Sequence, residues 1–198
     1  MLGPGVQDWV VGQRVGVEKF WLNPIQQDEA GCSNRKDIVM IKEFSGQYHV
    51  HESNRSFADV VAALEAAVGS VENEAFDHEL SEVRDPSDFE ARMHTHESTS
   101  GFMRFLTIDH GAWLAAIGIG GKARMYTIGN PLIARTMIKY DLGVGLNVPV
   151  RIAVYEEPSS GKVRVAYNLP SSLMSALDDK DVSEAAQALD AKLIAALG

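Results

Sequence analysis

The chain has 198 residues, of which 18 are Lys or Arg and 27 are Asp or Glu, so its formal net charge is −9. Hydrophobic residues make up 45% and charged residues 23%, which are the proportions of an ordinary globular protein. The acidic balance argues against a large nonspecific nucleic-acid surface and against attraction to anionic membranes, because both need clustered Lys and Arg. The length predicts one domain with room for an appendage.

The single cysteine, Cys32, excludes an intramolecular disulfide framework and a cysteine-based zinc site. Charged residues interrupt the N-terminus before a secretory signal can form, and no stretch of about 18 apolar residues exists to span a bilayer. These features predict a cytoplasmic protein that binds neither nucleic acid nor membrane.

The chain divides into an N-terminal extension and a main domain. Residues 1–37 are irregular and contain large aromatic side chains, which predicts an arm that packs on the domain or on a partner subunit. A lid over a pocket is the functional alternative for this arm. Residues 38–198 are predicted to form a single α+β domain with an acidic insertion at residues 71–100.

The main domain begins with a predicted strand and helix. Residues 38–43 and 47–51 have the character of extended chain. Ser56 opens a helix-start signal, and apolar residues then recur at helical spacing until Gly69.

The segment 71–100 carries many more carboxylates than arginines. Pro86, followed by Phe89 and Met93, predicts one short helix within it. The rest of the segment is predicted to be a solvated cover.

Residues 101–198 carry the strongest pattern. Alternating apolar residues predict strands, and helical spacing after Asn130 and near the C-terminus predicts helices. The resulting fold class is α+β, with a largely antiparallel sheet packed against two or three helices. The predicted strands cover residues 102–108, 123–128, 148–154 and 162–167, and the predicted helices cover residues 131–139 and 182–197.

Four short motifs in residues 102–174 follow one another in the order and at the spacing of a known family. With the strand and helix predicted at residues 47–69, they resemble the domain of unknown function 302 family. The resemblance implies a fold similar to the TATA-binding-protein-like α+β folds and a homodimer, and the family has no established reaction. The motifs are Ile108-Asp109-His110-Gly111, Ile128-Gly129-Asn130-Pro131, Val148-Pro149-Val150 and Val165-Ala166-Tyr167-Asn168-Leu169-Pro170.

His110 is the first candidate for chemistry. It is predicted at a strand end, beside Asp109, where a side chain can face a pocket. Histidine changes its protonation near neutral pH and also binds metals and haem. His110 and Asp109 are therefore the candidate catalytic residues, with His110 as a general acid or base. In the alternative, His110 is structural and Asp109 bonds the backbone of the following loop.

Asn130 is a candidate ligand-binding residue because it precedes a predicted helix. The free N–H groups of a helix N-terminus favour an anion, and Arg124 or Arg104 is placed to assist. The simple alternative is that Asn130 and Pro131 only start the helix.

Trp113, Tyr126 and Tyr167 complete the predicted ligand-binding set. Each offers an apolar body with one polar atom, which suits a mostly apolar ligand anchored at one end. The alternative is that these aromatic side chains belong to the core.

Two histidine pairs raise the possibility of metal binding. His49 and His51 share a face of a predicted strand, and His94 and His96 follow the predicted short helix. The alternative is that both pairs are exposed to solvent.

The leading prediction is a homodimer that binds a small, partly apolar molecule in a pocket near His110, Trp113 and the helix start at Asn130, with no resident cofactor. A second hypothesis is haem or metal binding through His110 or the His-x-His pairs. A third is a non-catalytic dimeric interaction module. The sequence leaves open whether the protein is an enzyme and which molecule it binds.

Overall fold

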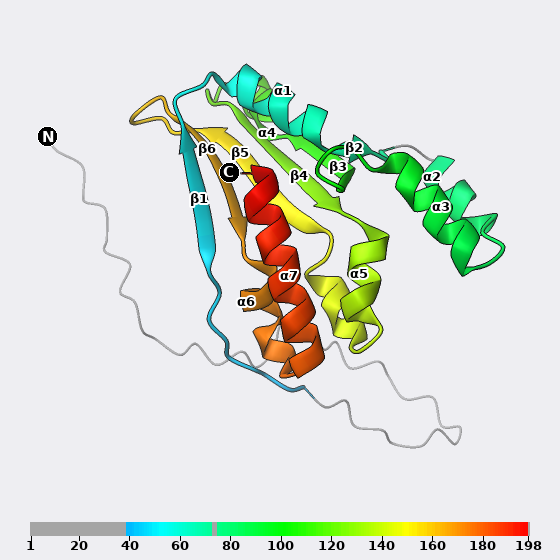
Figure 1. Cartoon of the computed structure of the whole chain (residues 1–198). Coiled ribbons are helices and arrows are strands. Elements are labelled where there is room, and N and C mark those ends of the chain that lie inside the picture. Colours follow the sequence, from blue (N-terminus) through cyan, green and yellow to red (C-terminus); the bar gives the residue numbers. More distant parts are fainter. Residues whose placement is uncertain (1–38, 73–74, 198) are drawn as a thin grey trace, which may run out of the picture. The chain divides into compact units, whose positions relative to one another are not determined.

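The computed structural model describes residues 39–72 and 75–197 (Figure 1). The predicted N-terminal arm, residues 1–37, lies outside the described residues. The contacts divide the chain between Met40 and Ile41, and the helices and strands described below belong to the second unit.

The centre of the fold is one mixed sheet. The described strands are β1 (Tyr48–Ser53), β2 (Gly69–Ser70), β3 (Met103–Asp109), β4 (Ala123–Gly129), β5 (Val150–Glu156) and β6 (Val163–Asn168). They lie in the order β1-β6-β5-β4-β3-β2. All neighbouring pairs are antiparallel except β2 and β3, which are parallel. The predicted α+β class with a largely antiparallel sheet is confirmed.

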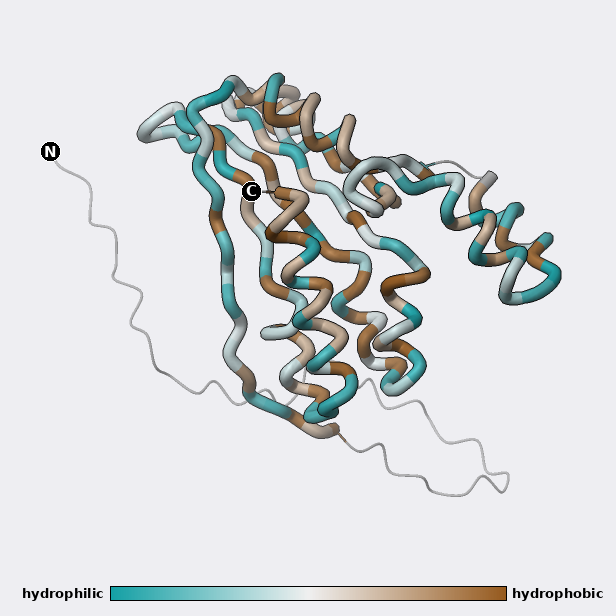
Figure 2. Tube along the Cα trace, viewed as in Figure 1, coloured by the Kyte–Doolittle hydropathy of each residue, from teal (hydrophilic) through white to brown (hydrophobic). Residues whose placement is uncertain are grey.

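Helices α1, α5 and α7 share one core with the sheet. Their buried side chains join those of β4, β5 and β6 in one hydrophobic cluster, and Figure 1 shows α7 lying along the strands. In Figure 2, hydrophobic and hydrophilic residues alternate along α7, as expected for a helix that buries one face. The described helices are α1 (Phe57–Ala67), α2 (Ala75–Ser81), α3 (Pro86–His96), α4 (His110–Ala116), α5 (Pro131–Ile138), α6 (Pro170–Met174) and α7 (Lys180–Leu197), with 3₁₀ turns η1 (Leu142–Leu146) and η2 (Ser175–Leu177).

Local side-chain chemistry explains where several elements begin. Ser56 Oγ accepts a hydrogen bond from the backbone N–H of Asp59 at 3.2 Å and caps α1. Asn130 Oδ1 accepts from the backbone N–H of Leu132 at 2.8 Å and caps α5, whose first residue is Pro131. Both helix starts occur where the sequence predicts them.

Gly69 follows α1 for a steric reason. A Cβ atom at this position would lie 1.9 Å from the backbone oxygen of His96, so only glycine allows β2 to approach the end of α3. The predicted stop at Gly69 is therefore correct, and its cause is a long-range contact.

Some predicted elements differ from the structure. Residues 39–43 form no strand, and α5 ends at Ile138, one residue before the predicted end of that helix. The sequence also missed α2, α4 and α6. In α4, Gly111 occupies the first turn, and glycine disfavours helix, so the pattern there is typical of a loop.

The acidic segment 71–100 contributes to the interior. Phe76 of α2 and Met93 of α3 are buried against Met103 of β3, in a second hydrophobic cluster. The predicted short helix at Pro86 is α3. The rest of the segment was predicted to be a solvated cover, whereas Phe76 of α2 buries its side chain against the edge of the sheet. None of the helices in the described part of the chain is long and apolar enough to cross a membrane.

Candidate functional site

Three of the predicted site residues meet where β3 and β4 lie under α1. Asp109 and Arg124 are register partners, and Arg124 Nη2 donates to Asp109 Oδ2 at 2.9 Å. Arg124 Nη1 donates to Glu65 Oε1 of α1 at 3.1 Å, and the Tyr126 hydroxyl donates to the same oxygen at 2.8 Å. Glu65 was missed by sequence reasoning, because 61 residues separate it from Tyr126. We call these four residues, with Arg104, the polar cluster.

The charged side chains of the polar cluster form ion pairs with one another and with Glu72. Arg104 Nε donates to Glu72 at 2.5 Å, and its Nη1 lies 3.5 Å from Glu65 Oε1. The hydrogen bond from Arg124 lowers the pKa of Asp109, and the backbone N–H of Ala112 acts in the same direction. The polar cluster therefore fastens α1 to β3 and β4.

Tyr126 is the fully buried member of the polar cluster. Burial raises the pKa of Tyr126 to about 12, and the Glu65 carboxylate adds to this rise while the hydrogen bond with Arg124 opposes it. The hydroxyl is thus a neutral donor at physiological pH. Its role in the structure is to hold Glu65.

His110 pairs with Trp113 and not with Asp109. It is the first residue of α4, and Trp113 Nε1 donates to His110 Nδ1 at 3.0 Å. Asp109 Oδ1 instead accepts from the backbone N–H of Ala112 at 2.9 Å and caps α4. This is the alternative that the sequence offered for Asp109. The His110–Trp113 pair lines none of the cavities described below.

Asn130 lies at the opposite end of β4 from His110. The register pairs Asp109 with Arg124 but Met103 with Gly129, five residues further along β4. Five residues of extended strand span about 17 Å. The sequence grouped His110 and Asn130 around one pocket, and the antiparallel pairing of β3 with β4 separates them.

Asn130 instead lies at an apolar cavity of about 300 Å³, which we call the α5 cavity. Among the described residues that line it, Asn130 alone has a polar side chain, and its amide is already hydrogen-bonded to the protein. Nδ2 donates to Glu97 Oε1 at 2.5 Å and to the Gly101 oxygen at 2.9 Å, while Oδ1 caps α5. The lining residues are Phe76, Leu80, Phe105, Gly129, Asn130, Pro131, Ile133, Ala134, Met137, Ile138, Val148, Pro149, Val150 and Leu189.

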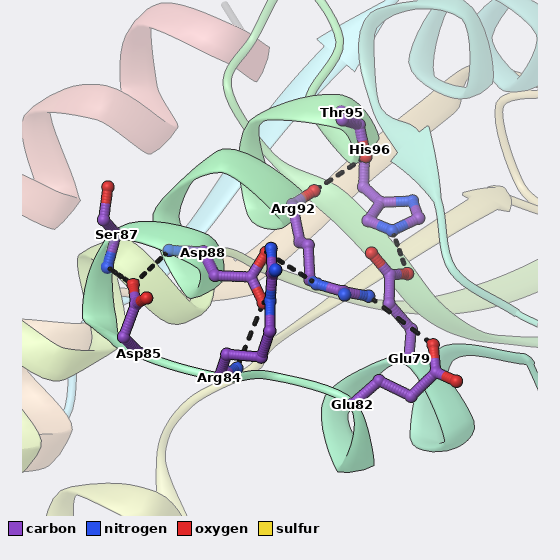
Figure 3. A network of polar contacts seen from close by, with 9 residues as sticks. All are labelled: Glu79, Glu82, Arg84, Asp85, Ser87, Asp88, Arg92, Thr95 and His96. Atoms are coloured by element: carbon purple, nitrogen blue, oxygen red, sulfur yellow. Dashed lines mark hydrogen bonds and ion pairs between the residues drawn. The ribbon is translucent and has the colours of Figure 1, made fainter.

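One wall of the α5 cavity is formed by α2, which a polar network joins to α3 (Figure 3). Across the two helices, His96 Nε2 lies 2.7 Å from Glu79 Oε2, and Arg92 Nη1 lies 3.9 Å from Glu82 Oε2. Arg92 also pairs with Asp88 at 3.2 Å within α3. These contacts hold Phe76 and Leu80 of α2 in place.

The two histidine pairs differ in their surroundings. His94 and His96 are each engaged by a carboxylate, Glu97 and Glu79 respectively. His49 and His51 share the helix-covered face of β1, as predicted, with Tyr167 opposite His49. In residues 39–72 and 75–197, no group of three or more His, Cys, Asp or Glu side chains is arranged to hold a metal ion.

Comparison with known families finds that the model for the domain of unknown function DUF302 matches residues 76–198. The chain belongs to the DUF302 family. A crystal structure of an uncharacterized conserved DUF302 protein from Bacillus stearothermophilus is similar, with a TM-score of 0.53 and 16% sequence identity over 76% of this chain and 94% of that chain. At this identity the likeness supports the fold alone. No curated protein matches the chain.

The DUF302 match begins at Phe76 in the first turn of α2, so all of α3 and all but the first residue of α2 lie in the matched range. All the residues that line the α5 cavity, from Phe76 to Leu189, fall in the matched range. The polar cluster depends on Glu65, which lies outside it. The α5 cavity is therefore the candidate site that the DUF302 domain builds from its own residues.

Proposed function

We propose that this DUF302 protein binds a small, largely apolar molecule in the α5 cavity. The observation that carries the proposal is an apolar hollow of about 300 Å³ with one polar side chain in its lining. Small-molecule sites are typically concave, mostly apolar hollows with a few polar groups in their lining. This volume equals that of about ten waters in the bulk liquid, and water gains few hydrogen bonds against apolar walls.

The lining indicates which ligands fit. No lining residue carries a charge, and both amide hydrogens of Asn130 are used by the protein. Phe76, Phe105 and Met137 offer ring edges and a polarizable thioether. A planar aromatic or branched hydrocarbon group suits these walls, and the volume lies at the lower end of the range for ligand pockets.

The proposal is for binding and includes no catalytic step. None of the lining residues has a titratable side chain, and the His110–Trp113 pair lies at the far end of β4. The acid–base role that the sequence assigned to His110 stays a prediction, because His110 is not among the residues that line the α5 cavity.

A cavity-filling variant tests the proposal. Ala134→Leu adds three carbon atoms inside the cavity on a helix that tolerates leucine. Ala191→Leu makes the same change on the exposed face of α7 and is the matched control. The probe is N-phenyl-1-naphthylamine, a neutral fluorescent ligand, titrated against the full chain.

We expect the probe to bind the wild type and Ala191→Leu alike, and Ala134→Leu to bind it at least about tenfold more weakly, since steric loss of 1.4 kcal/mol suffices for that change. A thermal melt checks that both variants fold. The proposal is wrong if the folded Ala134→Leu variant binds the probe as tightly as the wild type, or if the wild type does not bind it.

The homodimer implied by the family resemblance stays a prediction. Native mass spectrometry of the full chain counts subunits and detects any retained small molecule in one measurement. A monomer at micromolar concentration would contradict the predicted dimer without bearing on the α5 cavity.

A further inference from the structure

A second hollow lies at the β1 edge of the sheet, beside the C-terminal end of α7. It consists of two adjoining hollows of about 290 and 210 Å³ that share His51 and Leu197. We call it the β1–α7 groove. We propose that the β1–α7 groove binds a small amphipathic carboxylate, with the hydrocarbon body along the apolar floor and the carboxylate at the cationic and imidazole wall.

The polar wall is set by strand register. His49 pairs with Tyr167 and His51 with Val165, so both imidazoles lie on the face that the helices cover. The His49 ring is centred 5.7 Å from the Tyr167 ring. Polar groups of three residues therefore converge on the groove from two adjacent strands.

Within the described residues, the rings of His49 and His51 make no hydrogen bond or ion pair. Among the described residues, histidine rings make hydrogen bonds or ion pairs at His78, His94, His96 and His110 only. His49 and His51 are thus available to a ligand. Burial raises the pKa of the Tyr167 hydroxyl, with a further contribution from the Asp190 charge, so this group stays protonated and can donate to an anion.

The charge of the groove also favours an anion. The chain carries a net charge of −9, yet no Asp or Glu is among the described residues that line the groove. Asp190, whose charge acts on Tyr167, accepts hydrogen bonds from the backbone N–H and the hydroxyl of Ser171. Arg55 lies at one end, where its Nη2 donates to the Asp59 backbone oxygen at 2.9 Å and its other nitrogens remain for a ligand. Glu52, the nearest carboxylate along β1, points to the other face and pairs with Lys162 and Arg164.

The apolar part of the groove accepts a hydrocarbon chain. Val165 of one hollow and Tyr167 of the other are buried and form the floor, while Ile194 of α7 leaves 47% of its surface exposed. Val60, Ala63 and Leu64 of α1 continue the apolar lining toward Arg55. A carboxylate with a chain of several carbons therefore suits both the polar and the apolar lining of the groove.

Titration calorimetry on the full chain with octanoate tests the proposal, with 1-octanol as the uncharged comparison. We expect octanoate to bind at least about tenfold more tightly than 1-octanol, because a hydrogen bond to a charged group is worth about 1.5–3 kcal/mol. Each methylene removed from octanoate should weaken binding by up to about fourfold. Equal binding of octanol and octanoate would overturn the proposal, as would no binding of octanoate at millimolar concentration.

Pairs of matched variants test whether octanoate binds in the β1–α7 groove. Ala63→Leu narrows the groove, and Ala62→Leu makes the same change one residue away on the exposed side of α1. Arg55→Gln removes the cation, with the exposed Arg151→Gln as its control. We expect Ala63→Leu and Arg55→Gln to weaken octanoate binding at least about fivefold, and the controls to leave it unchanged.

The experiments can refute the proposed function and the groove proposal independently of each other. Ala134→Leu alters the α5 cavity and should not affect octanoate binding, and Ala63→Leu should not affect N-phenyl-1-naphthylamine. If octanoate binding responds to Ala134→Leu and not to Ala63→Leu, the carboxylate lies in the α5 cavity and the groove proposal is wrong. A thermal melt confirms folding, and His51→Gln provides a second variant should Ala63→Leu unfold.

Discussion

Tyr126→Phe tests whether the polar cluster stabilises the fold. Tyr126 has no exposed surface, and its hydroxyl donates to Glu65 Oε1 at 2.8 Å. Phenylalanine keeps the ring and its packing but removes this donor. Glu65 remains paired with Arg124 at 3.1 Å, so the variant leaves no isolated buried charge.

The expected loss of stability depends on the acceptor of this hydrogen bond, which is the charged Glu65 carboxylate. A hydrogen bond to a charged group contributes about 1.5–3 kcal/mol to stability. The Glu65 side chain is 34% exposed, so water replaces part of the lost bond and the lower end of this range applies. For a chain of this length, about 1.5 kcal/mol lowers Tm by about 3–6 °C.

The assay is thermal unfolding followed by circular dichroism, at neutral and alkaline pH. Folding raises the pKa of Tyr126 from 10.0 to about 12, so the stabilisation tied to its proton is complete below pH 10 and is lost as the pH rises toward 12. The difference in Tm between the wild type and Tyr126→Phe should shrink over that range. Tyr140→Phe, at a half-exposed tyrosine, is the matched control and should stay within about 0.5 kcal/mol of the wild type. A Tyr126→Phe melt that coincides with the wild type at neutral pH would refute this reasoning.

Two further substitutions test other parts of the fold. Asp88 pairs with the side chain and backbone N–H of Arg84, which lowers its pKa from 3.8 to about 2, so its contribution is present above pH 3.8 and lost as the pH falls toward 2. Asp88→Asn should therefore lower Tm at neutral pH and converge with the wild type near pH 2, and a constant difference across this range would contradict the assignment. Gly69→Ala should destabilise by about 1–3 kcal/mol in urea unfolding, because its Cβ would lie 1.9 Å from the His96 oxygen. Gly120→Ala, where a Cβ meets nothing within 4 Å, is the control and should be neutral or slightly stabilising, and equal losses at both positions would rule out the steric argument.

Local interactions explain most of the correct sequence predictions. Ser56 and Asn130 bind backbone N–H groups two or three residues away, so these caps are readable from a few neighbouring letters. Alternating apolar residues in β5 are buried at Val150, Ile152 and Val154, as a half-buried strand requires. The DUF302 resemblance rested on the same kind of short motif, and the family match confirms it.

The incorrect or missing predictions concern segments whose local composition favours one structure while capping or packing contacts stabilise another. Gly111 in the first turn of α4 disfavours helix, but the Asp109 cap and the close packing of this glycine against Gly121 and Ala123 prevail. The acidic composition of segment 71–100 is typical of a solvated surface. Phe76 and Met93 nonetheless bury their side chains, because β3 presents Met103 to them.

The sequence alone thus determined the fold class, most element starts and the family, because caps, turns and periodicity depend on residues close in the chain. It could not determine which side chains share a site. Asp109 meets Arg124, and Asn130 is separated from His110, only through the antiparallel register of β3 and β4. Glu65 reaches Tyr126 only because α1 packs over those strands. The α5 cavity joins residues from Phe76 to Leu189, and contacts over such distances are set by helix packing on the sheet, which no local pattern encodes.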